Sequence, residues 1–174
     1  TDVIDAMTTN ETFWFRDPPH FRILVDDVLP ALKSSRLRMW SAACSSGQEP
    51  YSLSMAIQEF LLRNPGRLPG GVEILGTDIA PSVLDFARIG EYSGRRIEKV
   101  PPKFLEKYFI PKKDEPGVYA VKDELKKLTN FYYLNFFKDR FPVDMDVIFC
   151  RNVMIYFDKI YQRRLVADFY KSIN

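Results

Sequence analysis

The sequence is poor in the two residue types on which much enzyme chemistry depends. Among its 174 residues there is one histidine, His20, and there are two cysteines, Cys44 and Cys150. A single histidine excludes nucleophile systems and metal sites that need further histidines, so we expect no metal site. Each cysteine ends an apolar run, and two cysteines are too few for a disulfide framework. We therefore predict that both thiols are reduced and packed as small core residues.

The sequence also lacks a long hydrophobic run and a strong net charge. No apolar stretch approaches the ~20 residues of a membrane span, and no signal peptide precedes Met7, so we expect a cytoplasmic protein without membrane insertion. The formal net charge of +2 is too small to indicate nucleic-acid binding. Residues 95–127, however, contain ten Lys/Arg and six Asp/Glu. This basic stretch is either a solvated surface or a patch for an acidic protein partner.

What the sequence does contain is the pattern of a cofactor-binding α/β domain. Residues 37–43 form an apolar run, the small residues 45–47 (Ser-Ser-Gly) follow, and Pro50 suits the first turn of a helix. A strand, a tight turn and a helix N-terminus together form the crevice in which open α/β sheets bind cofactors. The exposed N–H groups and the helix dipole favour a carboxylate or phosphate there.

The remaining elements follow the same α/β rhythm, with one interruption. Helical spacing of apolar residues predicts helices at 20–32, after the turn at 45–47, at 81–90 and at the end of the chain, while strands are expected at 72–77, 131–134 and 146–150. Asp158 is expected to cap the last helix, with Leu165, Val166, Phe169 and Ile173 inward. Between them, a proline-rich stretch predicts a helix near 103–109 and a strand at 118–121.

These patterns predict an α/β fold with a mostly parallel, Rossmann-like sheet and a small antiparallel insert. The strand–helix–strand unit from Leu37 to Asp78 is long enough for a parallel crossover. We divide the chain into an N-terminal segment and helix (1–36), the first half of the α/β domain (37–91), the insert (92–128) and the second half (129–174). Because the chain ends after a helix, we expect the C-terminal strands of the sheet to be missing.

The turn also bears on which cofactor binds. It has one glycine, whereas a dinucleotide fingerprint needs G-x-G-x-x-G and a phosphate loop needs G-x-x-x-x-G-K-[ST]. A cofactor without pyrophosphate, such as S-adenosylmethionine, fits better. Asp78, at the end of the second strand, either binds the ribose hydroxyls or is a turn carboxylate. Glu49 either completes a capping box with Ser46 or pairs with the cofactor's ammonium group.

Four motifs resemble those of the CheR-type chemotaxis receptor methyltransferases, in the family's order. They span residues 8–157 and read TTNETFWFR (8–16), SSGQEPYS (45–52), TDI (77–79) and CRNVMIYF (150–157). Gln48 and Trp14 replace the usual Glu and Phe. The resemblance implies a class I S-adenosylmethionine-dependent methyltransferase fold. It also implies a protein-glutamate O-methyltransferase that forms methyl esters on chemotaxis receptors and releases S-adenosyl-L-homocysteine.

The resemblance also implies which residues bind the cofactor and where the receptor docks. The cofactor contacts would be Asn10, Thr12, Arg16, Glu49, Asp78, Asn135, Phe136, Asn152 and Val153. The cytoplasmic domain of a chemotaxis receptor would dock on the basic insert at 92–128. The resemblance favours a cofactor role for Glu49.

A glutamate nucleophile has an ordinary side-chain pKa well below 7, so it is ionised at neutral pH and needs no general base. Alignment is what the reaction requires, and we predict Arg16 and Tyr156 as the catalytic residues, with Tyr156 alternatively an ordinary core aromatic. Two other functions remain open. One is a class I methyltransferase with another acceptor, although the usual N/D-P-P-Y/F motif is absent at 151–154. The other is a non-catalytic module that binds the cofactor or its product.

Overall fold

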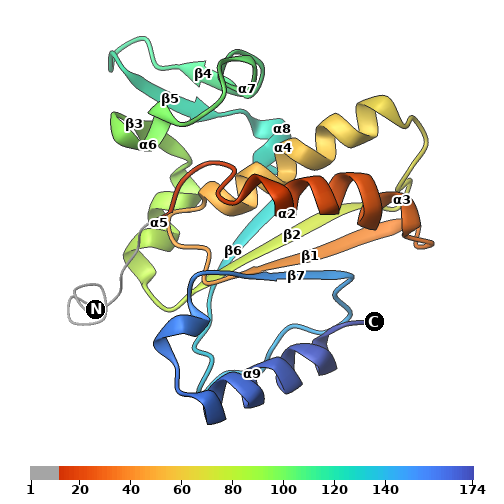
Figure 1. Ribbon diagram of the computed structural model, residues 1–174. Helices are drawn as coiled ribbons and strands as arrows, with labels where there is room; N and C mark the ends of the chain where they lie inside the picture. Colours follow the sequence, from red (N-terminus) through yellow and green to blue (C-terminus); the bar gives the residue numbers. More distant parts are fainter. Residues whose placement is uncertain (1–11) are drawn as a thin grey trace.

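The computed structural model describes residues 12–174, and its centre is a four-stranded parallel sheet (Figure 1). The strand order is β6-β2-β1-β7. The strands are β1 (Arg36–Ala42), β2 (Gly71–Asp78), β6 (Thr129–Tyr133) and β7 (Val147–Cys150). β1 pairs with β2 over seven residues and with β7 over four, in parallel on both sides. The predicted parallel crossover is thus confirmed.

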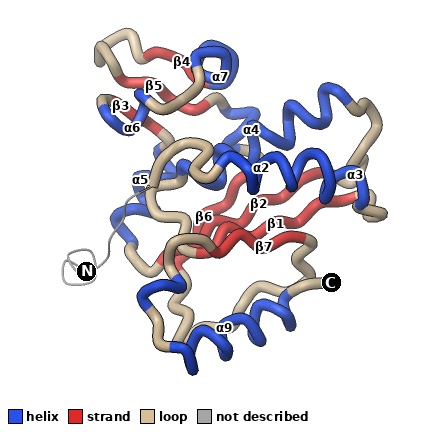
Figure 2. The backbone as a smooth tube through the Cα atoms, viewed as in Figure 1, coloured by secondary structure: helices blue, strands red, loops and turns tan. Residues whose placement is uncertain are grey.

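Helices cover both faces of this sheet, as Figures 1 and 2 show. One face carries α4 (Gln48–Arg63) and a helical segment made of α2 (Pro18–Ile23), a π-helical turn η1 (Leu24–Val28) and α3 (Leu29–Ala31). The other face carries α9 (Lys159–Ser172). Side chains alternate along β1: Met39 packs with α4, and Trp40 packs with Leu165 and Phe169 of α9. The sheet therefore separates two apolar layers.

The last helix partly departs from the prediction. The Asp158 carboxylate accepts a hydrogen bond from the Tyr161 N–H (2.7 Å), which confirms the expected N-cap. Leu165 and Phe169 are buried, but Val166 and Ile173 are 54% and 45% exposed. The inward assignment of these two was wrong. Ile173 follows the end of the helix and forms a bridge with Met145, and Val166 lies on the outer side of α9.

A second, antiparallel sheet interrupts the domain and confirms the predicted small β insert. Its strand order is β3-β5-β4, made of β3 (Glu91–Ser93), β4 (Phe109–Pro111) and β5 (Val118–Val121). Three short helices accompany it: α6 (Arg95–Glu98), α7 (Pro102–Tyr108) and α8 (Asp123–Lys126). In Figure 1 this unit lies beyond α4 and α5 (Pro81–Ile89), away from α9.

The insert is packed against the main domain by a shared apolar cluster and by Glu59 of α4. The cluster joins Trp14, Tyr51 and Met55 to Tyr92 and Tyr108. The Glu59 carboxylate accepts hydrogen bonds from Lys107 and, at 2.7 Å, from the Tyr108 hydroxyl. The insert is therefore held at a defined place beside α4.

The state of the two cysteines and the character of the helices can be compared with the sequence analysis. Cys44 and Cys150 are free cysteines, and Cys44 is buried in the core as predicted, whereas Cys150 is only half-buried. Within residues 12–174 no helix has the length and apolarity needed to cross a bilayer.

Candidate active site

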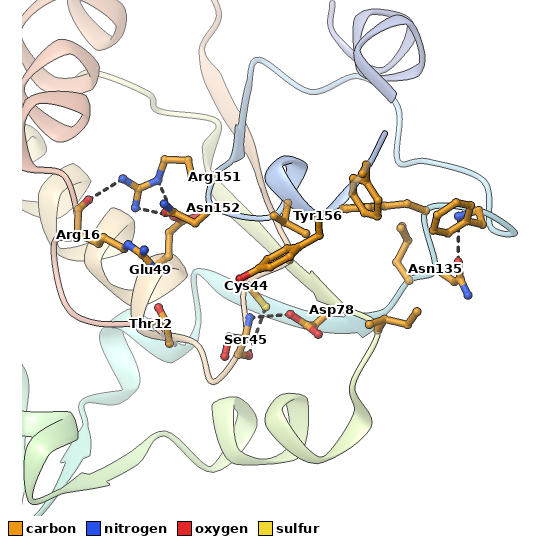
Figure 3. A pocket seen from close by; sticks show the side chains of 17 residues that line it. Thr12, Arg16, Cys44, Ser45, Glu49, Asp78, Asn135, Arg151, Asn152 and Tyr156 are labelled. Carbon is orange, nitrogen blue, oxygen red and sulfur yellow. Dashed lines mark hydrogen bonds and ion pairs between the residues drawn. The ribbon is translucent and has the colours of Figure 1, made fainter. Parts of the chain in front are cut away.

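A pocket of about 330 Å³ opens at the carboxyl ends of the strands of the main sheet (Figure 3). It takes residues from the turn after β1, from the ends of β2, β6 and β7, and from the segment before α2. Every described residue predicted for the site lies in its wall, whereas Asn10 lies outside the described residues. Those wall residues are Thr12, Arg16, Glu49, Asp78, Asn135, Phe136, Asn152, Val153 and Tyr156.

The turn after β1 forms the floor of the pocket. Its glycine, Gly47, has φ +90°, and a Cβ there would lie 2.8 Å from the Cβ of Ala87 and 3.0 Å from the hydroxyl of Tyr92. That hydroxyl donates to the carbonyl of Ser46 (2.7 Å). Ala43 and Ser45 also have positive φ. The turn is therefore bent tightly against α5 and β3, which requires glycine at position 47.

Backbone strain is concentrated around this pocket. Seven described non-glycine residues have positive φ, and five of them lie in the three segments that meet at the pocket: Phe15, Asp17, Ala43, Ser45 and Asn152. Such conformations cost free energy and persist only where surrounding contacts impose them. Their clustering supports a functional role for these segments.

Asp78 performs the structural role that the sequence left open and also reaches the pocket. Its Oδ2 accepts from the backbone N–H of Ser45 (2.8 Å) and its Oδ1 from that of Ala80 (3.0 Å). The residue is 7% exposed and contributes to the pocket wall. The turn-carboxylate interpretation therefore holds, and a ligand would meet a carboxylate already fixed by backbone donors.

Glu49 does not form the capping box. The hydroxyl of Ser46 donates to the side chain of Gln48 (2.8 Å), and the N-cap of α4 is Gly47, without a side-chain cap. The Glu49 carboxylate accepts from the Ser41 hydroxyl (2.7 Å) and pairs with the guanidinium of Arg151 (2.6 Å). Glu49 is thus held at the pocket by side chains rather than used to cap its helix.

Arg151 is the charged residue of the pocket wall that the sequence interpretation missed. It follows β7 directly, and its guanidinium contacts both Glu49 and the carbonyl oxygen of Arg16 (2.6 Å). These partners lie 102 and 135 residues away along the chain. The only available signal was its place in the motif at 150–157, directly before the predicted site residue Asn152.

Arg16 lies in the loop before α2, beside the insert. Its guanidinium carbon is 5.3 Å from the centroid of the Phe13 ring, and the ammonium of Lys99 lies 4.0 Å from the same centroid. Trp14 lies between Phe13 and Arg16 in the sequence. It is buried, and its indole N–H donates to the carbonyl of Arg96. The segment that carries Arg16 is therefore packed against α6 and the residues that follow it.

Tyr156 is not a core aromatic. It belongs to the short 3-10 helix η2 (Met154–Tyr156), is 60% exposed, and lines the pocket with its ring pointing inward (Figure 3). At the far end of the pocket, Asn135 accepts from the backbone N–H of Phe137 (2.9 Å), next to Phe136. The pocket thus has charged groups at one end and an amide with aromatic rings at the other (Figure 3).

The two thiols contribute little reactivity. Burial raises the pKa of Cys44 well above its ordinary value, and burial with the nearby Glu49 charge raises the pKa of Cys150 to about 12. Both thiols are therefore protonated at neutral pH and are poor nucleophiles. Among residues 12–174, no three His, Cys, Asp or Glu side chains are grouped as metal ligands would be.

Comparisons with known proteins agree with this architecture. The family described as "CheR methyltransferase, SAM binding domain" matches residues 10–174. Chemotaxis protein methyltransferase 1 of Pseudomonas aeruginosa is 46% identical over 98% of this chain and 64% of its own length. Chemotaxis protein methyltransferase Cher2 of Pseudomonas putida is 41% identical, with the same coverage. The chain thus spans slightly less than two thirds of these curated relatives.

Solved structures show the fold. Glycopeptide N-methyltransferase MtfA has a TM-score of 0.53 at 10% identity, covering 100% of this chain and 56% of that one. The same enzyme complexed with sinefungin has a TM-score of 0.50 at 11% identity, covering 99% and 56%. At such identities the likeness concerns the fold alone. Together with the parallel sheet, it confirms the predicted class I methyltransferase fold.

Proposed function

The chain belongs to the CheR methyltransferase family, of which it contains the S-adenosylmethionine-binding domain, and we propose that it methylates glutamate side chains of chemotaxis receptors. S-adenosylmethionine would be the donor, and glutamate methyl esters and S-adenosyl-L-homocysteine the products. The observation that carries the proposal is the single pocket wall shared by nine of the ten predicted site residues. Chemotaxis methyltransferases at 41–46% identity support the receptor as substrate.

The order of groups along the pocket fits the donor. Its adenosine would lie between Asp78 and the Asn135–Phe136 end, where a fixed carboxylate can accept from ribose hydroxyls and the aromatic ring can cover the base. Its amino-acid part would lie at the charged end, with the ammonium near Glu49 and the carboxylate near Arg16. The opposite charges at this end match a zwitterion.

The protein's task in the reaction is alignment. When bound, the donor supplies an electrophilic methyl group on a sulfonium, and a glutamate carboxylate is ionised at neutral pH without a base. Arg16 contributes a guanidinium and Tyr156 a hydroxyl to the pocket wall. Both groups can donate hydrogen bonds that orient the carboxylate. Such positioning can supply ~7–11 kcal/mol of a displacement barrier. The thiol of Cys44, which lines the pocket, is protonated at neutral pH and so does not compete as a nucleophile.

The insert would bind the receptor next to the pocket. Lys99 and Arg16 both lie against Phe13, so the basic side of the insert meets the pocket wall at this ring. Arg95, Arg96, Lys99 and Lys103 are exposed there. We expect this encounter to take place in the cytoplasm. An acidic receptor segment bound by these side chains would bring its glutamate to the pocket.

A charge reversal tests this docking. Lys99→Glu should raise KM for receptor cytoplasmic fragments several-fold and leave KM for the donor unchanged. Lys171→Glu, at an exposed position of α9, should change neither. Equal effects of the two variants would contradict docking on the insert.

The overall function is tested in two steps. Calorimetric titration with S-adenosylhomocysteine should show one site, and incubation with radiolabelled donor and receptor fragments should give label that alkali releases as methanol. Binding without transfer would indicate a non-catalytic module, and alkali-stable label would indicate a different acceptor. Absence of binding would overturn the cofactor assignment.

A further inference from the structure

Arg151 joins three segments of the chain that lie far apart in the sequence. It lies directly after β7, and its side chain is 11% exposed. Its Nε and Nη2 contact Glu49 Oε2 at 2.8 and 2.6 Å. Its Nη1 donates to the carbonyl of Arg16 (2.6 Å) and lies near the Asp17 carboxylate (3.3 Å) and His20 Nδ1 (3.2 Å). One guanidinium thus connects α4, the loop before α2 and the end of β7 (Figure 3).

The surroundings of this guanidinium strengthen its contacts. Its central carbon lies 5.6 Å from the ring centroids of both Phe21 and Phe149. The Glu49 side chain is 12% exposed, so little water competes for the ion pair. The other Glu49 oxygen accepts from Ser41, a fully buried residue of β1. The Glu49 carboxylate is therefore fixed from two sides.

We propose that Arg151 is a positioning residue for donor binding, acting through Glu49 and through the segment that carries Arg16. This inference rests on the proposed function. By holding the Glu49 carboxylate and the Arg16 backbone with one planar group, Arg151 sets the spacing between the two charges that receive the donor's ammonium and carboxylate. Lysine cannot replace it, because a single ammonium has no fork that reaches the Glu49 carboxylate in bidentate fashion and the Arg16 carbonyl together.

The test is a double-mutant cycle between Arg151 and Glu49, read as the dissociation constant of S-adenosylhomocysteine by calorimetry. Arg151→Met and Glu49→Gln should each weaken binding by ~10-fold or more, since each breaks a desolvated charge pair. The double variant should bind within ~3-fold of the weaker single variant, because both substitutions remove the same arrangement. Arg151→Lys should lie between wild type and Arg151→Met.

Controls separate positioning from folding. Arg38→Met removes another arginine that pairs with a carboxylate (Glu73, 2.9 Å) and donates to a backbone carbonyl (Val143, 2.9 Å), but outside the pocket wall, and should leave the dissociation constant within ~2-fold of wild type. A variant that is only partly folded would show reduced binding stoichiometry with an unchanged dissociation constant. The double variant, which leaves no unpaired Glu49 charge, keeps the test valid if Arg151→Met alone unfolds.

Two results would overturn the inference. Wild-type affinity in Arg151→Met would show that Arg151 does not position the site. Fully multiplicative losses in the double variant would show that it acts independently of Glu49, by direct contact with the ligand. Failure of the wild-type protein to bind S-adenosylhomocysteine is a different outcome, which removes the proposed function itself.

Discussion

Asp78 Oδ2 and the backbone N–H of Ser45 are joined by a 2.8 Å hydrogen bond that links the end of β2 to the turn after β1. The two residues are 33 positions apart, yet the parallel pairing of β1 with β2 brings the ends of both strands to one edge. The same carboxylate also accepts from Ala80 at the start of α5. A residue proposed to bind ribose thus also shapes the turn beneath the donor.

Asp78→Ala should therefore lower both stability and donor affinity. Two backbone donors lose their acceptor, which we expect to cost roughly 1–3 kcal/mol of unfolding free energy. Denaturant unfolding and calorimetry with S-adenosylhomocysteine measure the two effects, with Asp85→Ala, at an exposed position of α5, as control. Lower stability with unchanged affinity would leave Asp78 a purely structural carboxylate.

Arg16→Ala should remove most methyl transfer while the fold survives. Arg16 lies in a loop and lines the pocket, and its backbone carbonyl, which Arg151 uses, is retained in the variant. We expect a loss of about 100-fold or more in kcat/KM, since a planar fork that orients a carboxylate is lost. Radiolabelled donor gives the rate and circular dichroism the fold. Turnover like that of wild type would remove Arg16 from the mechanism.

Tyr156→Phe should reduce the rate without changing stability. The ring stays, and at 60% exposure the lost hydroxyl should alter unfolding free energy by less than about 0.5 kcal/mol. If the hydroxyl orients the incoming carboxylate, kcat should fall roughly 10- to 100-fold, as for a lost hydrogen bond to a charged group. Tyr170→Phe, on α9 at 81% exposure, is the matched control. Equal rates in the two variants would show that the Tyr156 hydroxyl is not used.

Gly47→Ala should destabilise the protein through two effects. Its positive φ costs about 1–2 kcal/mol for a residue with a Cβ, and that Cβ would press on Ala87 and Tyr92. Gly66→Ala separates the effects, because Gly66 also has positive φ (+83°) but a Cβ there meets nothing within 4 Å. The denaturant midpoint should fall more for Gly47→Ala than for Gly66→Ala. Only Gly47→Ala should also lower donor affinity. Equal midpoints would mean that the turn relaxes freely.

Glu59→Gln should give a pH-dependent loss of stability. Burial by itself would raise the pKa of the Glu59 carboxyl, but hydrogen bonds from Lys107 and Tyr108 outweigh it and hold that pKa below its usual 4.5. A carboxyl with a lowered folded pKa stabilises the fold above pH 4.5, and this contribution is lost as pH falls through the folded value. The unfolding free energy of wild type should therefore exceed that of the variant by roughly 1–3 kcal/mol at pH 7.

That difference should shrink as the pH is lowered below 4.5, as followed by urea unfolding at several pH values. Glu106→Gln, exposed on α7, should show no such trend. A difference between wild type and Glu59→Gln that is the same at pH 7 and pH 3 would contradict the role of the charge.

Local patterns were sufficient for most of the fold. The alternation and termination of apolar runs predicted β1, β2 and β7 within one or two residues, and Asp158 was recognised as an N-cap from its position alone. Such features depend on residues close in sequence. The inward assignment of Val166 was wrong because helical periodicity cannot tell how far the neighbouring surface extends over α9. The boundaries at 92 and 128 and the roles of the site residues remain predictions.

The amino-acid sequence by itself determined the family, the glycine at the bend of the turn, and nine of the residues that line the pocket, because these depend on motifs of a few residues each. Only the tertiary structure decided which groups the Glu49 carboxylate pairs with, because the local sequence fitted a cap of its own helix equally well. It also decided the place of Arg151, whose partners lie more than 100 residues away. Strand order and register bring such residues together, and no short stretch of the chain determines either of them.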